Sequence, residues 1–109
     1  MKIWLDDIRE TPDESWVRVR NEKEFFDLLE CIREDEEIEV ISFDHDLGEG
    51  EPTGHDILKK LIFRCIKESS FRFWPHRVES QSDNPPGRAN ILGLAASFEA
   101  SYASPMRAL

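Results

Sequence analysis

Two pairs of acidic residues stand directly behind short apolar segments and have the types and spacing for metal or phosphate chemistry. They are Asp6 with Asp7, behind residues 2–5, and Asp44 with Asp46, behind residues 38–43. If both segments are neighbouring parallel strands, the carboxylates converge at the sheet edge where open α/β sheets bind ligands. Two carboxylates ~4 Å apart repel by about 4 kcal/mol at an effective dielectric constant near 20. Such a cluster either has a raised pKa or binds a cation, and its oxygens suit Mg²⁺ or Mn²⁺. The alternative is that these acids only cap turns.

A third segment, Ser82 to Gly87, stands ahead of an expected helix. Gly87 permits a close approach of the backbone to a ligand, and a helix start offers unpaired N–H groups and the positive end of its dipole. Ser82 adds a hydroxyl donor. The Ser82 hydroxyl and the helix-start N–H groups, together with a metal held by the acidic residues opposite them, would bind a phosphoryl group. The alternative is an ordinary Pro/Gly turn.

His45 lies between Asp44 and Asp46, and strand geometry predicts that its side chain points away from theirs. This orientation favours a packing or supporting role for the imidazole. At the end of a strand, where the pleat relaxes, His45 can instead enter the site as an acid or base. Both interpretations of His45 stay open.

Hydrophobic periodicity predicts the elements that position these residues. Strands are expected at residues 2–5, 16–20, 38–43 and 77–82. Helices are expected after the capping residues Asn21 and Thr53, and after a turn at residues 83–87. This order predicts an α/β fold, with a mostly parallel sheet of about four strands and flanking helices, in one domain over residues 1–109.

The composition excludes several classes of protein. The chain has 109 residues, with 14 Lys and Arg against 23 Asp and Glu, so its formal net charge is 14 − 23 = −9. That field repels nucleic-acid backbones and anionic membranes, which argues against a duplex DNA binder or a membrane protein. No apolar run approaches the ~20 residues that span a bilayer, and the N-terminus does not resemble a signal peptide. We expect a cytoplasmic protein with Cys31 and Cys65 as unpaired thiols at or near the core, and with Trp4 and Trp16 in the core.

Four motifs, in order, are similar to those of one family. They are LDDIR at residues 5–9, SFDHDLG at 42–48, TGHDIL at 53–58 and SDNPPGRAN at 82–90. Over roughly residues 1–98 the chain resembles the cyclic-phosphate-processing receiver domain, a compact offshoot of the response-regulator receiver fold. The resemblance implies a receiver-like (flavodoxin-like) sheet that is shortened at the C-terminus. It also implies processing of cyclic phosphates, with RNA ends or cyclic nucleotides among the candidate substrates.

The resemblance also implies roles for single residues. Asp6 and Asp7 match the acid pair of the receiver metal pocket, Asp44 matches the phosphoacceptor, and Asp46 completes the family's Asp-His-Asp. The implied phosphate- or ligand-binding residues are Thr53, Gln81, Ser82, Asn84, Gly87 and Asn90. Relatives usually carry His where this chain has Gln81, which can hydrogen-bond a phosphate or ribose but cannot titrate. Acid–base catalysis would therefore depend on His45 or be lost.

The first functional hypothesis is an enzyme. Mg²⁺ or Mn²⁺ held by the four acids Asp6, Asp7, Asp44 and Asp46 would polarise a cyclic phosphate or related phosphoester. Water or Asp44 would attack phosphorus, while Ser82 and the helix-start N–H groups stabilise the added charge. The catalytic candidates are Asp44, His45 and Ser82.

Two other functions compete with the enzyme. A phosphoacceptor receiver in signalling is disfavoured, because receivers pair the phosphoryl group with a Lys after a fifth strand, and the last lysine here is Lys67. A module that binds a phosphorylated ligand without turnover is favoured by Gln81. In each case the expected partner is a phosphate-containing small molecule or an RNA end, and the sequence identifies no protein partner.

Overall fold

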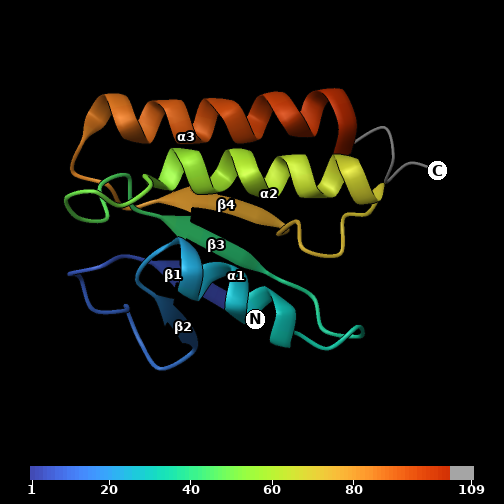
Figure 1. The fold of residues 1–109 in the computed structure, drawn as a ribbon, viewed down its shortest axis with the longest axis horizontal. Helices are drawn as coiled ribbons and strands as arrows, with labels where there is room; N and C mark the ends of the chain where they lie inside the picture. Colours follow the sequence, from blue (N-terminus) through green and yellow to red (C-terminus); the bar gives the residue numbers. More distant parts are fainter. Residues whose placement is uncertain (104–109) are drawn as a thin grey trace.

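All four strands run parallel in one sheet, in the order β2-β1-β3-β4 (Figure 1). The computed structural model describes residues 1–103. The strands are β1 (Lys2–Leu5), β2 (Trp16–Val19), β3 (Val40–Phe43) and β4 (Arg77–Ser80). The helices are α1 (Glu22–Cys31), α2 (Gly54–Glu68) and α3 (Pro85–Phe98), followed by the π-helix η1 (Glu99–Ala103). The predicted α/β fold is confirmed, and within residues 1–103 no fifth strand follows β4.

The register of the strands aligns their carboxyl ends. Leu5 of β1 pairs with Val19 of β2 and with Phe43 of β3, and Phe43 pairs with Ser80 of β4. The next residue along each strand therefore begins a loop at the same edge of the sheet. The N–H of Asp44 still bonds to the carbonyl of Leu5 at 2.9 Å. This alignment brings the chemistry-bearing loops together.

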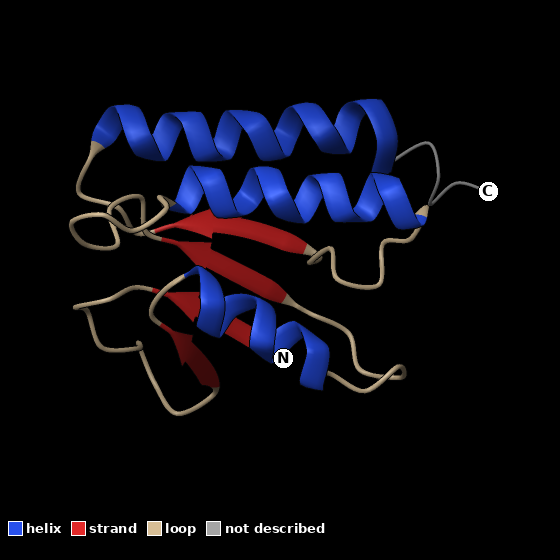
Figure 2. Cartoon of the chain, viewed as in Figure 1, coloured by secondary structure: helices blue, strands red, loops and turns tan. Residues whose placement is uncertain are grey.

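The main core lies on one face of the sheet, which we call the helix face. It carries Ile3, Leu5, Ile41 and Phe43, all fully buried in one cluster with apolar side chains of all three helices. Figure 2 shows α1 in front of the strands and α2 alongside the upper edge of the sheet. Right-handed connections from β2 to β3 and from β3 to β4 require their helices to share a face. Burial contributes about 1.5–3 kcal/mol for each large apolar side chain.

The opposite side, which we call the second face, carries the alternate strand residues. They are Lys2, Trp4, Trp16, Arg18, Val40, Ser42, Arg77 and Glu79. Trp4 and Val40 are buried, yet they do not belong to the main core cluster. The prediction for Trp4 is thus confirmed. The prediction that Trp16 is a core residue is wrong, because this side chain is only half-buried on an edge strand of the second face.

Capping residues fix the starts of α1 and α2 as the sequence predicted. The side chain of Asn21 accepts from Glu24 N–H at the start of α1, and Thr53 and Asp56 form a reciprocal capping box at α2. The third helix begins earlier than expected. Pro85 and Pro86 form its first turn rather than a preceding turn, because proline suits the first helical positions.

Several strand boundaries, and the burial of one cysteine, differ from those predicted. β3 begins at Val40 rather than Ile38, and β4 ends at Ser80 rather than Ser82. Cys31 ends α1 and is exposed, so its predicted place near the core is wrong. Cys65 is buried as predicted, and burial raises the pKa of its thiol to about 11.

Among the described residues, none of the helices has the length and apolarity that a bilayer crossing requires.

Candidate functional site

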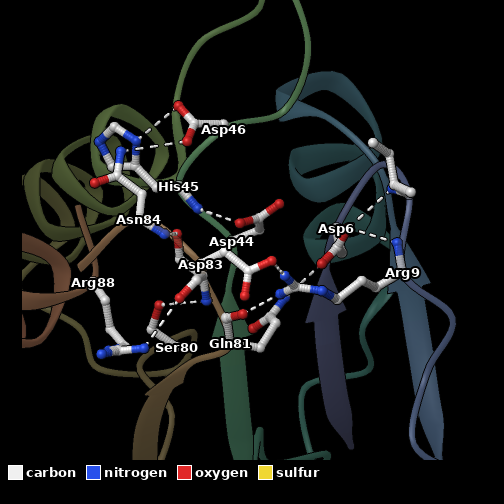
Figure 3. A network of polar contacts seen from close by, with 12 residues as sticks. Asp6, Arg9, Asp44, His45, Asp46, Ser80, Gln81, Asp83, Asn84 and Arg88 are labelled. Atoms are coloured by element: carbon white, nitrogen blue, oxygen red, sulfur yellow. Dashed lines mark hydrogen bonds and ion pairs between the residues drawn. The ribbon is translucent and has the colours of Figure 1, made fainter. Parts of the chain in front are cut away.

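A pocket of about 330 Å³ opens at the carboxyl ends of the strands. Figure 3 shows polar side chains of this region, among them Asp6, Arg9 and Asp44. The pocket is lined by Asp6, Asp7, Ile8, Arg9, Asp44, Asp46, Ser82, Asp83 and Asn84. Five of these side chains are carboxylates and one is a guanidinium, so the lining carries a formal charge of −5 + 1 = −4. An anionic ligand therefore requires a further positive charge in order to bind here.

Asp6 is held rigidly in a buried position. The side chain is only 1% exposed, and its Oδ1 accepts N–H bonds from Ile8 at 2.9 Å and Arg9 at 2.8 Å. This local turn explains why a short polar residue directly follows β1. Oδ2 accepts a longer bond from the amide of Gln81, at 3.3 Å. These bonds leave lone pairs on Oδ2 free for a further ligand.

Asp6, Asp7 and Asp44 form a compact group of carboxylates. One oxygen from each lies within 4.8 Å of the others. Oδ1 of Asp7 is buried and has no hydrogen-bond partner. An unsatisfied buried acceptor costs about 1–3 kcal/mol, and more when it is charged. The structure therefore keeps an unfavourable arrangement that a cation would relieve.

The buried, anionic surroundings of Asp44 change the pKa of its carboxyl group. Burial raises the pKa of its carboxyl above the ordinary value, and the nearby charge of Asp6 raises it further. Its Oδ1 accepts the N–H of His45 at 2.9 Å, which opposes the shift. Hard oxygen donors in a crowded anionic group fit Mg²⁺ or Mn²⁺ better than softer metals. The residues present therefore fit a divalent cation.

Asp46 lies at the pocket but outside this group. Its Oδ1 lies 3.1 Å from Nδ1 of His45, and its Oδ2 accepts from the side-chain amide of Asn84 at 3.4 Å. The His45 contact, and then the Asn84 bond, lower the pKa of Asp46. Asp46 thus links the loop after β3 to the start of α3. Its role as a metal ligand stays a prediction.

The prediction that His45 points away from Asp46 is wrong, because the strand pleat ends at Phe43 and the two side chains turn toward each other. The imidazole does not line the pocket and lies against the backbone of Gly87. A Cβ at Gly87 would lie 2.5 Å from Cγ of His45. This position favours the packing interpretation of His45.

The start of α3 does not provide the free N–H groups that were expected. Pro85 and Pro86 have no N–H, and the N–H of Gly87 bonds to the side chain of Asn84 at 3.0 Å. Ser82, by contrast, is a pocket residue with a usable donor. Its Oγ accepts the N–H of Asn84 at 3.1 Å, which leaves the hydroxyl proton free to donate.

Three other predicted ligand residues lie outside the pocket lining. Thr53 caps α2, and Asn90 is exposed in α3. The amide of Gln81 donates to the carbonyl of Leu5 at 3.0 Å, and its oxygen accepts from Ser42 Oγ at 2.5 Å. Because its polar atoms already have partners, Gln81 positions Asp6 more readily than it binds a ligand. Ligand contacts by these three residues stay predictions.

Sequence reasoning gave no role to Arg9 and Asp83. The guanidinium of Arg9 donates to the backbone oxygen of Gln81 and pairs with Asp83, so it joins the loops after β1 and β4 (Figure 3). Arg9 is the one cation among the described residues that line the pocket. The signal was available, since Arg9 closes the motif LDDIR three residues after Asp6.

Comparison with known proteins agrees with this geometry. The sequence model of the family described as cyclic-phosphate processing receiver domain matches residues 1–97. Neither the comparison with curated proteins nor that with solved structures found a match. The match covers the whole sheet and all but the last residue of α3, and it includes every pocket residue. The chain therefore belongs to the cyclic-phosphate processing receiver domain family.

Proposed function

We propose that this domain binds Mg²⁺ or Mn²⁺ and processes a cyclic phosphate or a related phosphoester. The unpartnered, buried Oδ1 of Asp7, within 4.8 Å of oxygens from Asp6 and Asp44, is the observation that carries the proposal. A carboxylate that served only to cap a turn would have its oxygens hydrogen-bonded. Family membership supports a cyclic phosphate as the substrate class. The proposed substrates within that class are an RNA end or a cyclic nucleotide.

Each pocket residue has a proposed task. Asp6, Asp7 and Asp44 would hold the cation, which supplies the positive charge that the phosphate needs in a pocket of formal charge −4. Ser82 would donate its hydroxyl hydrogen to a phosphoryl oxygen. Arg9 would offer a second charged contact, since its guanidinium is partly exposed at the pocket and its partner Asp83 is 91% exposed.

The proposed reaction is hydrolysis of a cyclic phosphodiester. Water forms a new bond to phosphorus, and the bond from phosphorus to one ring oxygen breaks. One proton of the water ends on the released oxygen, and the product is a phosphomonoester. Asp44 is the group proposed to take the proton from the water or, in a covalent variant, to attack phosphorus itself. In the covalent variant the bond from phosphorus to one ring oxygen breaks, that oxygen takes a proton, and the nucleotide stays joined to Asp44 through phosphorus until water hydrolyses this acyl phosphodiester. Trapping the nucleotide on Asp44 would distinguish the covalent variant.

Ordinary phosphorelay receives less support. Lys67 lies in the last turn of α2, whereas Gly54, the first residue of this 15-residue helix, lies against the backbone of Asp44. A helix of that length spans about 22 Å, so Lys67 is too distant to pair with a phosphoryl group on Asp44.

Binding without turnover is the second candidate, and a specific observation favours it. No histidine is among the described residues that line the pocket, and Gln81 replaces the family's usual His. A leaving oxygen would then lack a donor that titrates near neutral pH. Tight binding of a cyclic nucleotide with no product would select this candidate.

The test is hydrolysis of several 2′,3′-cyclic nucleotides with Mg²⁺ or Mn²⁺ by wild type and Asp44→Asn. We expect metal-dependent turnover by wild type and a loss of about 100-fold in Asp44→Asn. Asp27→Asn, at an exposed position on α1, is the matched control and should retain full activity. If wild type binds no cyclic nucleotide and turns none over with either metal, the proposal is wrong.

A further inference from the structure

Three side chains of the second face reach the loop that follows β1. Arg18, Trp4 and Ser42 form one row across β2, β1 and β3, because Trp4 pairs with both of the others in the register. Nε of Arg18 donates to the backbone oxygen of Asp6 at 3.2 Å. Nε1 of Trp4 donates to the backbone oxygen of Arg9, also at 3.2 Å. Two members of the row therefore hold the backbone of this loop.

Ser42, the third member of the row, reaches the same loop through Gln81. Its side chain is a buried polar group, with only 2% of the residue exposed. The Ser42 hydroxyl donates to Oε1 of Gln81 at 2.5 Å. The amide nitrogen of Gln81 donates to the backbone oxygen of Leu5 at 3.0 Å and to Oδ2 of Asp6 at 3.3 Å. A chain of hydrogen bonds from β3 thus ends on one of the three clustered carboxylates.

The Ser42 hydroxyl supports one orientation of the Gln81 amide. In the observed orientation the amide nitrogen faces two acceptors, and the amide oxygen faces the hydroxyl donor. The reverse orientation would place the amide oxygen against the carbonyl of Leu5 and the carboxylate of Asp6, which are also acceptors. Without the hydroxyl, the amide oxygen would lose the donor that it has in the structure, and an unpaired buried acceptor is unfavourable. The Gln81 side chain would then turn toward another donor and release Asp6.

Asp6 is the carboxylate on which such support has most effect. Its Oδ1 is already fixed by the N–H groups of Ile8 and Arg9, so the bond from Gln81 determines how Oδ2 is held. Hydrogen bonds from outside a metal site orient its carboxylate ligands, and their loss typically weakens metal binding about 10- to 100-fold. Ser42 and Gln81 are both uncharged, so removing either side chain changes the geometry of the site and not its charge.

We propose that Ser42 is a positioning residue of the cation site and that it acts through the side chain of Gln81. This inference rests on the proposed function and adds a residue that does not line the pocket. Ser42 fixes the amide of Gln81, and the amide fixes the orientation of the Asp6 carboxylate. Ser42 itself contacts neither the cation nor the substrate.

The test is a calorimetric titration of Mn²⁺ into wild type, Ser42→Ala, Gln81→Met and the double variant at pH 7. Each single variant should bind Mn²⁺ about tenfold more weakly than wild type. Because Ser42 acts through Gln81, the double variant should bind as Gln81→Met does, rather than about a hundredfold more weakly than wild type. Ser42→Cys, which offers a weaker donor at a similar volume, should have an intermediate affinity.

Val40→Ala is the control that separates positioning from a loss of stability. Val40 is fully buried on the same strand and the same face as Ser42, and its side chain has no polar group. Val40→Ala should unfold at a lower urea concentration than wild type, because it leaves a cavity, and should bind Mn²⁺ with unchanged affinity. If Val40→Ala weakens Mn²⁺ binding as much as Ser42→Ala does, the effect is a general loosening of the sheet and the inference is overturned.

The other outcomes separate this inference from the proposed function. If wild type and Ser42→Ala bind Mn²⁺ equally well, or if the losses of the two single variants add in the double variant, the inference is overturned and the cation site stands. If the variants weaken Mn²⁺ binding as expected but wild type hydrolyses no cyclic nucleotide, the positioning role holds and the enzymatic function fails. If wild type binds no Mn²⁺, both fail. Ser42→Cys keeps the test valid if Ser42→Ala does not fold.

Discussion

The two ends of the sheet both carry acidic pockets, but only one has the electrostatics of a binding site. At the amino end, a pocket of about 600 Å³ is lined by Glu34, Glu36, Glu37, Ile38, Phe71, Arg72, Trp74 and His76. At the carboxyl end the pocket is smaller, about 330 Å³. Volume alone would therefore select the amino end.

The two pockets differ in the burial and the hydrogen-bond partners of their carboxylates. Glu37 at the amino end is 81% exposed and lies 3.0 Å from its partner His76. At the carboxyl end, Asp6 is buried, Oδ1 of Asp7 has no partner, and the pKa of Asp44 is raised by burial and then by Asp6. Ionisable groups with perturbed pKa values cluster at functional sites, which favours the carboxyl end. The comparison can be tested by changing one end at a time.

The largest expected effect comes from Gly54→Ala at the carboxyl end. A Cβ there would lie 1.8 Å from the backbone oxygen of Asp44, and neither backbone can move without disturbing β3. We expect a loss of about 3 kcal/mol or more in the free energy of unfolding, measured by urea denaturation. Gly93→Ala on α3 meets nothing within 4 Å and should gain about 0.5–1 kcal/mol. Equal effects at the two glycines would show that the carboxyl end is not tightly packed.

The sequence predicted most of the fold because its local signals agree with the tertiary structure. The caps at Asn21 and Thr53 mark two helix starts, and alternation in β2 together with the apolar run ending at Phe43 marks two strands. The start of α3 was less clear, because the Pro-Pro-Gly sequence fits both a turn and a first helical turn. β4 was weakly predicted, since Val78 is its one clear apolar residue.

The sequence predicted the acidic residues of the site well and its other residues less well. Asp6, Asp7 and Asp44 each follow a strand, so parallel topology alone brings them together. Arg9 and Asp83 pair across 74 residues of sequence, and such a contact depends on loop geometry that no local pattern encodes. The packing of His45 against Gly87 likewise depends on how α3 docks, which spacing along the chain cannot reveal.

The second prediction concerns the link from Asp46 to α3. Asn84→Ala removes the cap of α3 and the bond to Asp46, and should cost about 1 kcal/mol in the free energy of unfolding. Asn21→Ala removes the equivalent cap of α1 and should cost about as much. Calorimetry with a cyclic nucleotide should show weaker binding in Asn84→Ala alone. Equal ligand binding by the two variants would argue that the α3 cap does not support the site.

The third prediction concerns the raised pKa of Asp44. Because folding raises this pKa, the folded state binds the proton more tightly than the unfolded chain, so the ionised group destabilises the fold at neutral pH. Without divalent cations, Asp44→Asn should therefore be more stable than wild type at pH 7, by a few tenths to about 1 kcal/mol because the side chain is partly solvated. The advantage should shrink as the pH falls through the raised pKa and vanish below about 3.9, the ordinary value. Thermal unfolding across pH 3–8 measures this, and an advantage that persists at pH 3 would contradict the assignment.

The smallest effect is expected at the amino end. Glu37→Gln breaks an exposed contact with His76 and should change the free energy of unfolding by less than about 0.5 kcal/mol. The same variant should leave metal and nucleotide binding unchanged. A marked loss of either would mean that the larger, amino-end pocket takes part in function.

The most direct test of the central claim is a calorimetric titration of Mn²⁺ and Mg²⁺ into wild type, Asp7→Asn and Glu37→Gln at pH 7. If three converging carboxylates at the carboxyl end form a cation site, wild type and Glu37→Gln bind one ion per chain with the same affinity. Asp7→Asn, which removes the charge from the unpartnered carboxylate, should then bind at least tenfold more weakly. Absence of binding by wild type at millimolar metal, or unchanged affinity in Asp7→Asn, would contradict the account.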